Sequence, residues 1–254
     1  WYEAGIYYFS APYDFDAIDM LDPYVPAYKI GSGDITWIEA CLRIASKGKP
    51  VLLATGASDI GDVQRAVDAI LAVNPQLVLM QCNTNYTADP ANFNHIHLNV
   101  LKTYHDMYPQ LILGLSDHTQ GMATVLGAVA LGARVIEKHF TDDNSREGPD
   151  HAFAMNPESF AQMVTATRQL ERAMGSGNKV VAANEKETVV IQRRCLRAAR
   201  AIQPGETLTR EMIAVLRPAT PGAIMPYEIE AVIGTRVLVP IAAGQELRWT
   251  MLGA

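Results

Sequence analysis

Two pairs of polar residues with the same spacing carry the strongest chemical signal in the sequence. Ser116 and His118 stand two residues apart at the end of one apolar run. Glu137 and His139 repeat that spacing at the end of the next apolar run. Residues two apart in a β-strand share a face, and consecutive parallel strands are usually neighbours. Two imidazoles, a carboxylate and a hydroxyl then converge, which suits a divalent metal ion with open positions for water and substrate. The alternative is that each histidine only caps its strand by hydrogen bonding.

A lysine beside a glycine-rich turn is a second candidate. Lys29 lies in an apolar run that leads into Gly31-Ser32-Gly33. Glycines let backbone N–H groups approach an anion, and an ammonium group there neutralises a phosphate or carboxylate. Lys29 and Ser32 are three residues apart, so they share a ligand only if the strand ends near Gly31. The alternative is a lysine that extends from the strand end into solvent.

Other polar positions give weaker indications. Residues 144–151 form a polar, turn-rich segment, which is a candidate lid or sugar-binding loop or else a solvated connection. Cys82 has no histidine near it in the sequence, and we interpret it as a small buried residue. We expect the remaining histidines of the central region to lie on the surface; these are His95, His97 and His105.

The elements that must position these residues alternate between short apolar runs and amphipathic stretches. The predicted strands are 6–9, 28–30, 51–54, 77–80, 111–115 and 135–136. The predicted helices are 35–47, a segment capped by Ser58 and ending near 71, 122–131, and a segment capped by Asn156 with Pro157 at its first position that ends near 174. This alternation indicates a parallel sheet with helical crossovers.

Six strands cannot close a (β/α)₈ barrel, although every polar strand end lies where such a barrel places its active site. The fold is therefore an open doubly wound sheet or an α/β TIM barrel that lacks its first two βα units. The first residue is Trp1 rather than Met, which favours the second interpretation. We expect a partial barrel at 1–175, a linker at 176–193 and a small β-rich domain at 194–254. That domain repeats Ile-x-x-Gly-x-x-Leu at 202–208 and 241–247, which predicts a pseudo-symmetric pair of turns.

Composition excludes several classes of protein. Hydrophobic residues make up 49% and charged residues 19% of the 254 residues, which supports a packed core. The net charge of −6 without a basic stripe argues against nucleic acid as the main partner. We expect no membrane association, because charged residues interrupt every long apolar run. The sequence shows no signal peptide, and three cysteines without metal-ligand spacing favour a reducing, cytoplasmic setting.

Several motifs together resemble the sialic acid (N-acetylneuraminate) synthase family. They are KIGSGD at 29–34, ATGAS at 54–58, GLSDHT at 114–119, ALGARVIEKHFT at 130–141 and GPDHAFAMNP at 148–157. Leu216-Arg217-Pro218 and the repeated glycine turn resemble that family's antifreeze-protein-like (SAF) domain, a small β-clip fold. The resemblance implies a (β/α)₈ barrel followed by this domain. It also implies a domain-swapped homodimer in which each small domain covers the partner's barrel mouth.

The resemblance further implies a transferase that condenses phosphoenolpyruvate with N-acetylmannosamine or a related sugar aldehyde, giving a sialic-acid-type nonulosonate and phosphate. It assigns roles to ten residues: His118 and His139 as ligands of Mn²⁺ or Mg²⁺; Lys29, Ser32 and Ser116 as the phosphoenolpyruvate site; Glu137 and Asp150 as catalytic residues at the sugar or the condensing centre; Thr84 and Tyr86 as substrate-pocket residues; and Arg217 as a residue that enters the neighbouring subunit's site. The sugar acceptor stays open among N-acetylmannosamine, its 6-phosphate and 6-deoxy diamino sugars.

The sequence departs from the family pattern in three places. The first two barrel strands, with a glutamate and a phosphate-binding lysine, are absent, so we expect the 254 residues alone to be inactive and poorly folded as a monomer. Ala54 replaces a common serine. The order Cys82-Asn83-Thr84-Asn85 leaves open which residue takes the role of the family's asparagine. The competing functions are a non-catalytic carbohydrate-binding protein and a metal-dependent pyruvate aldolase that releases no phosphate.

Overall fold

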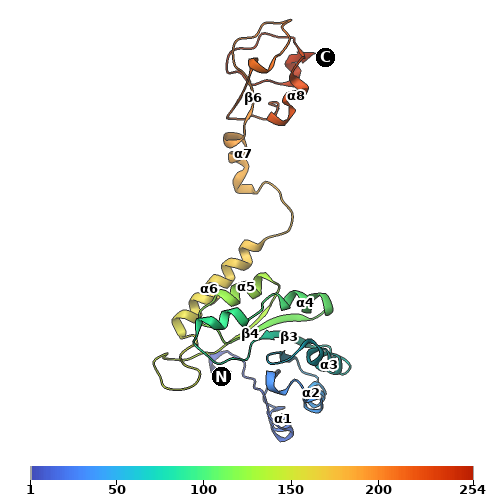
Figure 1. The fold of residues 1–254 in the computed structure, drawn as a ribbon, viewed down its shortest axis with the longest axis vertical. Coiled ribbons are helices and arrows are strands. Elements are labelled where there is room, and N and C mark those ends of the chain that lie inside the picture. Colours follow the sequence, from blue (N-terminus) through green and yellow to red (C-terminus); the bar gives the residue numbers. More distant parts are fainter. Residues whose placement is uncertain (1, 254) are drawn as a thin grey trace. The chain divides into compact units, whose positions relative to one another are not determined.

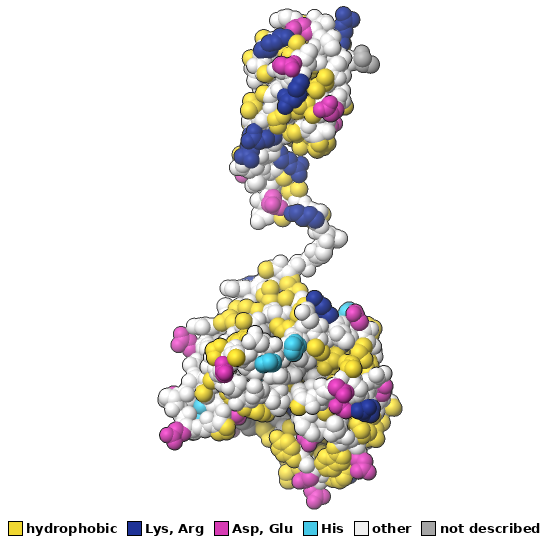
Figure 2. All heavy atoms as spheres, viewed as in Figure 1, with side chains coloured by type: hydrophobic (Ala, Val, Ile, Leu, Met, Phe, Trp, Pro, Cys, Tyr) yellow, Lys and Arg dark blue, Asp and Glu magenta, His cyan; other side chains and the backbone are white. Residues whose placement is uncertain are grey.

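The computed structural model describes residues 2–253, which divide into two compact units (Figure 1 and Figure 2). The first unit extends to Gly175, and the second begins at Ser176. Each unit has its own hydrophobic core. Within the described residues, no helix combines the length and the apolar character needed to cross a membrane.

The first unit is built on a parallel sheet of five strands that follow one another in chain order, from β1 at one edge to β5 at the other. The strands are β1 (Tyr28–Ile30), β2 (Val51–Ala54), β3 (Leu77–Cys82), β4 (Ile112–Asp117) and β5 (Val135–Lys138). Five of the six predicted strands are therefore confirmed, with ends shifted by up to two residues. A parallel sheet whose strands follow chain order, with helical connections, is consistent with part of a (β/α)₈ barrel.

The prediction of a strand at residues 6–9 is wrong. Residues 6–9 form no strand, and the adjacent Ser10 O accepts a hydrogen bond from Lys29 N at 3.2 Å. A run of four apolar residues makes a stable strand when both of its faces are covered. Here all four side chains are exposed, Tyr7 by 84%. The segment therefore follows the edge of β1 without completing a ladder.

The helices of the first unit are α1 (Phe15–Leu21), α2 (Ile38–Ala45), α3 (Ile60–Leu71), α4 (Val100–Met107), α5 (Ala123–Ala130) and α6 (Pro157–Met174). The predicted cap of α6 is confirmed, because Asn156 accepts a hydrogen bond from Ser159 N. The predicted cap of α3 is wrong by one residue. Asp59 forms a capping box with Asp62, whereas the Ser58 hydroxyl donates to Gly56 O.

Alternation along the strands separates a helix-facing side of the sheet from an inner side. Leu53 and Leu79 belong to the main core with the helices, whereas Leu52, Val78 and Met80 form a separate small cluster. Register places Lys29 beside Leu52, and it places Ser116 beside both Cys82 and Glu137. Partners in a parallel ladder share a face, so the predicted site residues follow the inner apolar layer toward the carboxyl ends of the strands.

The second unit is small and rich in turns. Its elements are α7 (Lys186–Gln192), β6 (Cys195–Ala198), β7 (Ile213–Leu216), α8 (Ile229–Val232), β8 (Arg236–Val237) and β9 (Leu252–Gly253). The two copies of the repeated motif lie against each other, because Ile202 and Ile241 exchange two backbone hydrogen bonds of 2.9 and 3.0 Å. Gly205 and Gly244 have φ values of 91° and 78°, which explains the glycine in each copy.

Candidate active site

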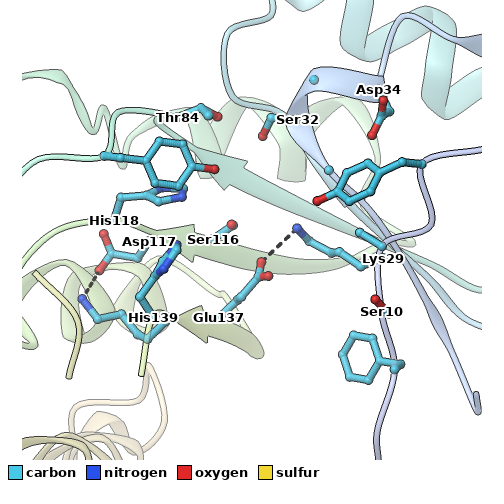
Figure 3. A pocket seen from close by; sticks show the side chains of 17 residues that line it. Ser10, Lys29, Ser32, Asp34, Thr84, Ser116, Asp117, His118, Glu137 and His139 are labelled. Atoms are coloured by element: carbon cyan, nitrogen blue, oxygen red, sulfur yellow. Dashed lines mark hydrogen bonds and ion pairs between the residues drawn. The ribbon is translucent and has the colours of Figure 1, made fainter. Parts of the chain in front are cut away.

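A cavity of about 780 Å³ opens at the carboxyl ends of β1, β4 and β5 (Figure 3). Eight of the ten predicted site residues line it: Lys29, Ser32, Thr84, Tyr86, Ser116, His118, Glu137 and His139. Sequence reasoning missed several further lining residues, namely Phe9, Ser10, Ala11, Tyr13, Asp34, Asp117 and Lys138. The chain therefore brings together residues separated by more than a hundred positions in its sequence.

Two neighbouring strands supply the pairs Ser116/His118 and Glu137/His139, which we call the strand-end dyads. β4 and β5 pair in parallel, and Ser116 is the register partner of Glu137. The predicted adjacency of the two strands is therefore confirmed. The two imidazole rings lie with their centroids 5.0 Å apart and their planes inclined by 48°.

The surroundings of the two imidazoles favour their neutral forms. Burial lowers the pKa of His118, although a hydrogen bond to the Asn83 backbone opposes the shift. Burial and then the proximity of His118 lower the pKa of His139. Nδ1 of His139 lies 3.3 Å from Oδ2 of Asp150, to which the neutral ring can donate. Such a hydrogen bond leaves Nε2 of His139 as the ring atom able to bind a metal ion.

Two aromatic rings fix the orientation of the imidazoles. Tyr86 lies across both of them, at centroid distances of 4.6 Å from His118 and 5.7 Å from His139. Phe153 contacts the same two rings at 6.3 and 5.0 Å, respectively, and its side chain is buried. Phe153 follows the polar segment 144–151, and its apolar side chain gave no sign of a role in the site.

Lys29 and Ser32 face the same cavity because the strand ends between them. β1 ends at Ile30, and Ser32–Asp34 form a 3-10 turn. The strand therefore ends near Gly31, as Lys29 and Ser32 require in order to share a ligand. Nζ of Lys29 lies 3.0 Å from Oε2 of Glu137, with side-chain exposures of 11% and 46% (Figure 3). Lys29 is thus paired with Glu137 inside the cavity, and an entering anion competes with Glu137 for Lys29.

Ser32 is positioned through a glycine on the next loop. The Gly56 N–H donates to Ser32 Oγ at 2.9 Å. A Cβ at Gly56 would lie 1.9 Å from Thr84 Oγ1 and 2.9 Å from Ser32 Oγ. Only glycine therefore permits this approach of the two hydroxyl groups. Of the three adjacent polar residues at 83–85, Thr84 lines the cavity, whereas the side-chain amide nitrogen of Asn85 donates to Asn92 Oδ1 at 3.1 Å.

Both units match known protein families. Residues 2–179 match the NeuB family, and residues 193–253 match the SAF domain. The chain belongs to the NeuB family. It is 36% identical to an N,N'-diacetyllegionaminic acid synthase of Legionella pneumophila over 98% of this chain and 70% of that protein. It is 32% identical to the human N-acetylneuraminate-9-phosphate synthase over 94% of this chain and 66% of that protein.

A solved structure shares the NeuB fold. The N-acetylneuraminic acid (sialic acid) synthetase of Leptospira borgpetersenii, in complex with citrate, superposes with a TM-score of 0.68 and 29% identity. The match covers 74% of this chain and 65% of that one. The chain spans 63% of the length of one curated relative and 70% of another. The resemblance to sialic acid synthases with an SAF domain is thus confirmed.

The remaining two predicted site residues of this NeuB chain do not line the cavity. Asp150 contacts His139 from the segment that follows β5. Hydrogen bonds hold that segment in place, because the Asn144 side-chain amide nitrogen donates to both His151 O and Ala154 O. Arg217 belongs to the second unit, where it is exposed directly after β7.

The donor set fits a divalent ion that takes part of its coordination from water or substrate. Within residues 2–253, no three side chains of the His, Cys, Asp and Glu types are grouped so as to hold an ion. His118 and His139 are the two nitrogen donors that the NeuB cavity offers. Cys82 is buried as expected, but folding brings its Sγ to 3.9 Å from His118 Nδ1, a contact that sequence separation concealed. The other three histidines of the central region are exposed, as predicted.

Proposed function

We propose that this chain carries the catalytic cavity of a nonulosonate synthase, which condenses phosphoenolpyruvate with an N-acyl amino-sugar aldehyde and releases phosphate. One observation carries the proposal: a lysine, two serines, a glutamate and two imidazoles meet in a single cavity at the carboxyl ends of parallel strands. A cation with hydroxyl donors suits an anionic substrate, and two nitrogen donors beside it suit a metal ion.

The residues divide between the two substrates. Lys29, Ser32 and Ser116 are the donors that would hold the phosphate and carboxylate of phosphoenolpyruvate. His118 and His139 would hold Mn²⁺ or Mg²⁺, which when bound supplies Lewis-acid polarisation of the sugar carbonyl. Tyr86 lies against the imidazoles, Thr84 lines the same cavity, and both would contact the sugar.

The proposed reaction forms one carbon–carbon bond and breaks one carbon–oxygen bond. C3 of phosphoenolpyruvate attacks the aldehyde carbon, and the aldehyde oxygen takes up a proton. Water adds at C2, and the resulting tetrahedral centre expels phosphate to leave a 2-keto acid. Glu137, which lines the cavity, and Asp150, which contacts His139, would orient the sugar hydroxyls and move these protons.

The assembly around the cavity forms part of the proposal. We infer that the active form is a closed eight-stranded barrel of which this chain supplies β1 to β5, so that the 254 residues alone do not turn over. We also infer a domain-swapped homodimer in which Arg217 of one protomer enters the other protomer's cavity. An arginine there would complete the neutralisation of the substrate charge and would couple activity to dimerisation.

Phosphate release tests the proposal. The assay uses the extended chain, meaning these residues with the βα units that the eight-stranded barrel still lacks supplied upstream of Trp1. It is incubated with phosphoenolpyruvate and a panel of N-acyl sugars, with and without EDTA. We expect phosphate release with one sugar, dependent on Mn²⁺ or Mg²⁺, and that sugar identifies the acceptor. A keto acid formed from pyruvate without phosphate would establish an aldolase instead. Sugar binding with neither product would establish a carbohydrate-binding protein.

A further inference from the structure

An ion pair borders the cavity from the helix-facing side of the same two strands: both of its residues are among those that line the cavity, but their side chains are buried. Asp117 separates the two residues of the β4 dyad, and Lys138 separates the two residues of the β5 dyad. Nζ of Lys138 lies 2.9 Å from Oδ2 of Asp117, with side-chain exposures of 1% and 0% (Figure 3). The two residues are also register partners in the β4–β5 ladder.

Hydrogen bonds satisfy the pair. Thr124 of α5 donates to Asp117 Oδ2 at 2.6 Å, and the Thr119 hydroxyl donates to Asp117 Oδ1 at 2.9 Å. The backbone N–H of Thr119 donates to Oδ1 as well, and Lys138 also donates to Thr119 O. A buried polar network with every member bonded holds one defined geometry. This one joins the ends of β4 and β5 to the first turn of α5.

Apart from this pair, β5 is held by its ladder with β4 and by the partly buried Val135 and Ile136. β5 has four residues, pairs only with β4 among the described strands, and has no residue that is fully buried. A slip of one residue along β4 would turn His139 and Glu137 away from the cavity, because alternate residues face opposite sides. Replacing a buried ion pair by apolar residues is often neutral for stability, so stability alone is a weak reason for this pair.

We propose that Asp117 and Lys138 are positioning residues that set the register and spacing of the strand-end dyads. Neither side chain has to touch a substrate, because both act through the backbone of the strands that carry His118 and His139. The kinetic and metal-binding tests of this positioning role rest on the proposed synthase function. The crystallographic test does not depend on that function.

The decisive variant is the double substitution Asp117→Asn with Lys138→Met in the extended chain. It removes both charges together, so that neither is left buried without a partner as in each single variant. Val67→Ala is the matched control, because Val67 is fully buried in α3 and its truncation weakens the core away from β5. The measurements are Mn²⁺ affinity by electron paramagnetic resonance, kcat, the KM for phosphoenolpyruvate, the melting temperature and a crystal structure of the double variant.

We expect the double variant to fold, to bind Mn²⁺ about tenfold more weakly and to lose about tenfold in kcat, as is usual when the groups supporting metal ligands are removed. The KM for phosphoenolpyruvate should stay within a factor of about two. Val67→Ala should lose melting temperature but keep its Mn²⁺ affinity. Wild-type Mn²⁺ affinity and kcat in the double variant, or an equal loss in Val67→Ala, would overturn the proposal.

Failure of the proposed function gives a different result. In that case the wild-type chain itself shows neither Mn²⁺ binding nor turnover, and the crystal structure decides. A ring-centroid distance that has moved from 5.0 Å, or a shifted Ser116–Glu137 register, supports the positioning role. Unchanged rings and register in the double variant overturn it.

Discussion

The ion pair between Lys29 and Glu137 predicts opposite effects for two substitutions on the affinity for phosphoenolpyruvate. Lys29 is mostly buried and lies 3.0 Å from a half-exposed Glu137. Loss of a hydrogen bond to a charged group costs about 1.5–3 kcal/mol, so Lys29→Met should raise the Kd for phosphoenolpyruvate by roughly 10- to 150-fold. Glu137→Gln should lower that Kd, because it frees the lysine from its present partner. A half-exposed pair is worth about 0.2–1 kcal/mol, which corresponds to a gain of about 1.4- to 5-fold.

Isothermal titration of the extended chain with phosphoenolpyruvate, without sugar or metal, measures both Kd values. Glu158→Gln is the control, because it removes one negative charge from an exposed position at the start of α6. It should leave the Kd unchanged. If competition for Lys29 causes the gain, the gain should disappear when Glu137→Gln is combined with Lys29→Met. Weaker binding in Glu137→Gln than in the wild type would refute the reasoning.

Three further predictions concern other parts of the chain. Gly56→Ala should weaken phosphoenolpyruvate binding in the same titration by about tenfold or more, because its Cβ would lie 1.9 Å from Thr84 Oγ1. The control Gly177→Ala, whose Cβ would meet nothing within 4 Å and which lies outside the cavity, should leave the Kd unchanged. Burial raises the pKa of Glu246, but hydrogen bonds from Thr220 and the charge of Arg197 outweigh burial and lower the pKa below its usual value of 4.5. The second unit should therefore lose stability as the pH falls below 4.5, and calorimetry should show a smaller loss of stability at acid pH for Glu246→Gln. Burial raises the pKa of Cys41 to about 11, so this thiol should react with Ellman's reagent at pH 8 only after denaturation, and rapid reaction in the folded chain would contradict that.

The sequence predicted the inner face of the sheet well, for a physical reason. Residues two apart on a strand share a face, so the spacing of Ser116 from His118 and of Glu137 from His139 implied their orientation. Strands that follow one another with helical connections are neighbours in a parallel sheet, which placed the two dyads side by side. Lys29 was placed correctly because glycines beyond a strand indicate where it ends.

Long-range neighbours were harder to predict from the same patterns. Cys82 appeared to lack a histidine because 36 residues separate it from His118, although register brings the two side chains together. Phe153 appeared to be an ordinary apolar residue, and only the fold of the segment after β5 places it against both imidazoles. Residues 6–9 have the composition of a strand, but composition does not supply the cover that both of its faces require.

The largest omission, the pair of Asp117 and Lys138, follows from the rule that found the dyads. The spacing of two assigns the residues between dyad members to the helix-facing side, where apolar packing is the usual expectation. From the sequence alone, a carboxylate and an ammonium group at these positions are expected on the surface. In the structure the β4–β5 register pairs Asp117 with Lys138, and Thr124 of α5 donates a hydrogen bond to Asp117. The same alternation therefore places the reactive groups on one face and their fixed support on the other. In this chain each support residue lies next in sequence to the histidine whose strand it holds.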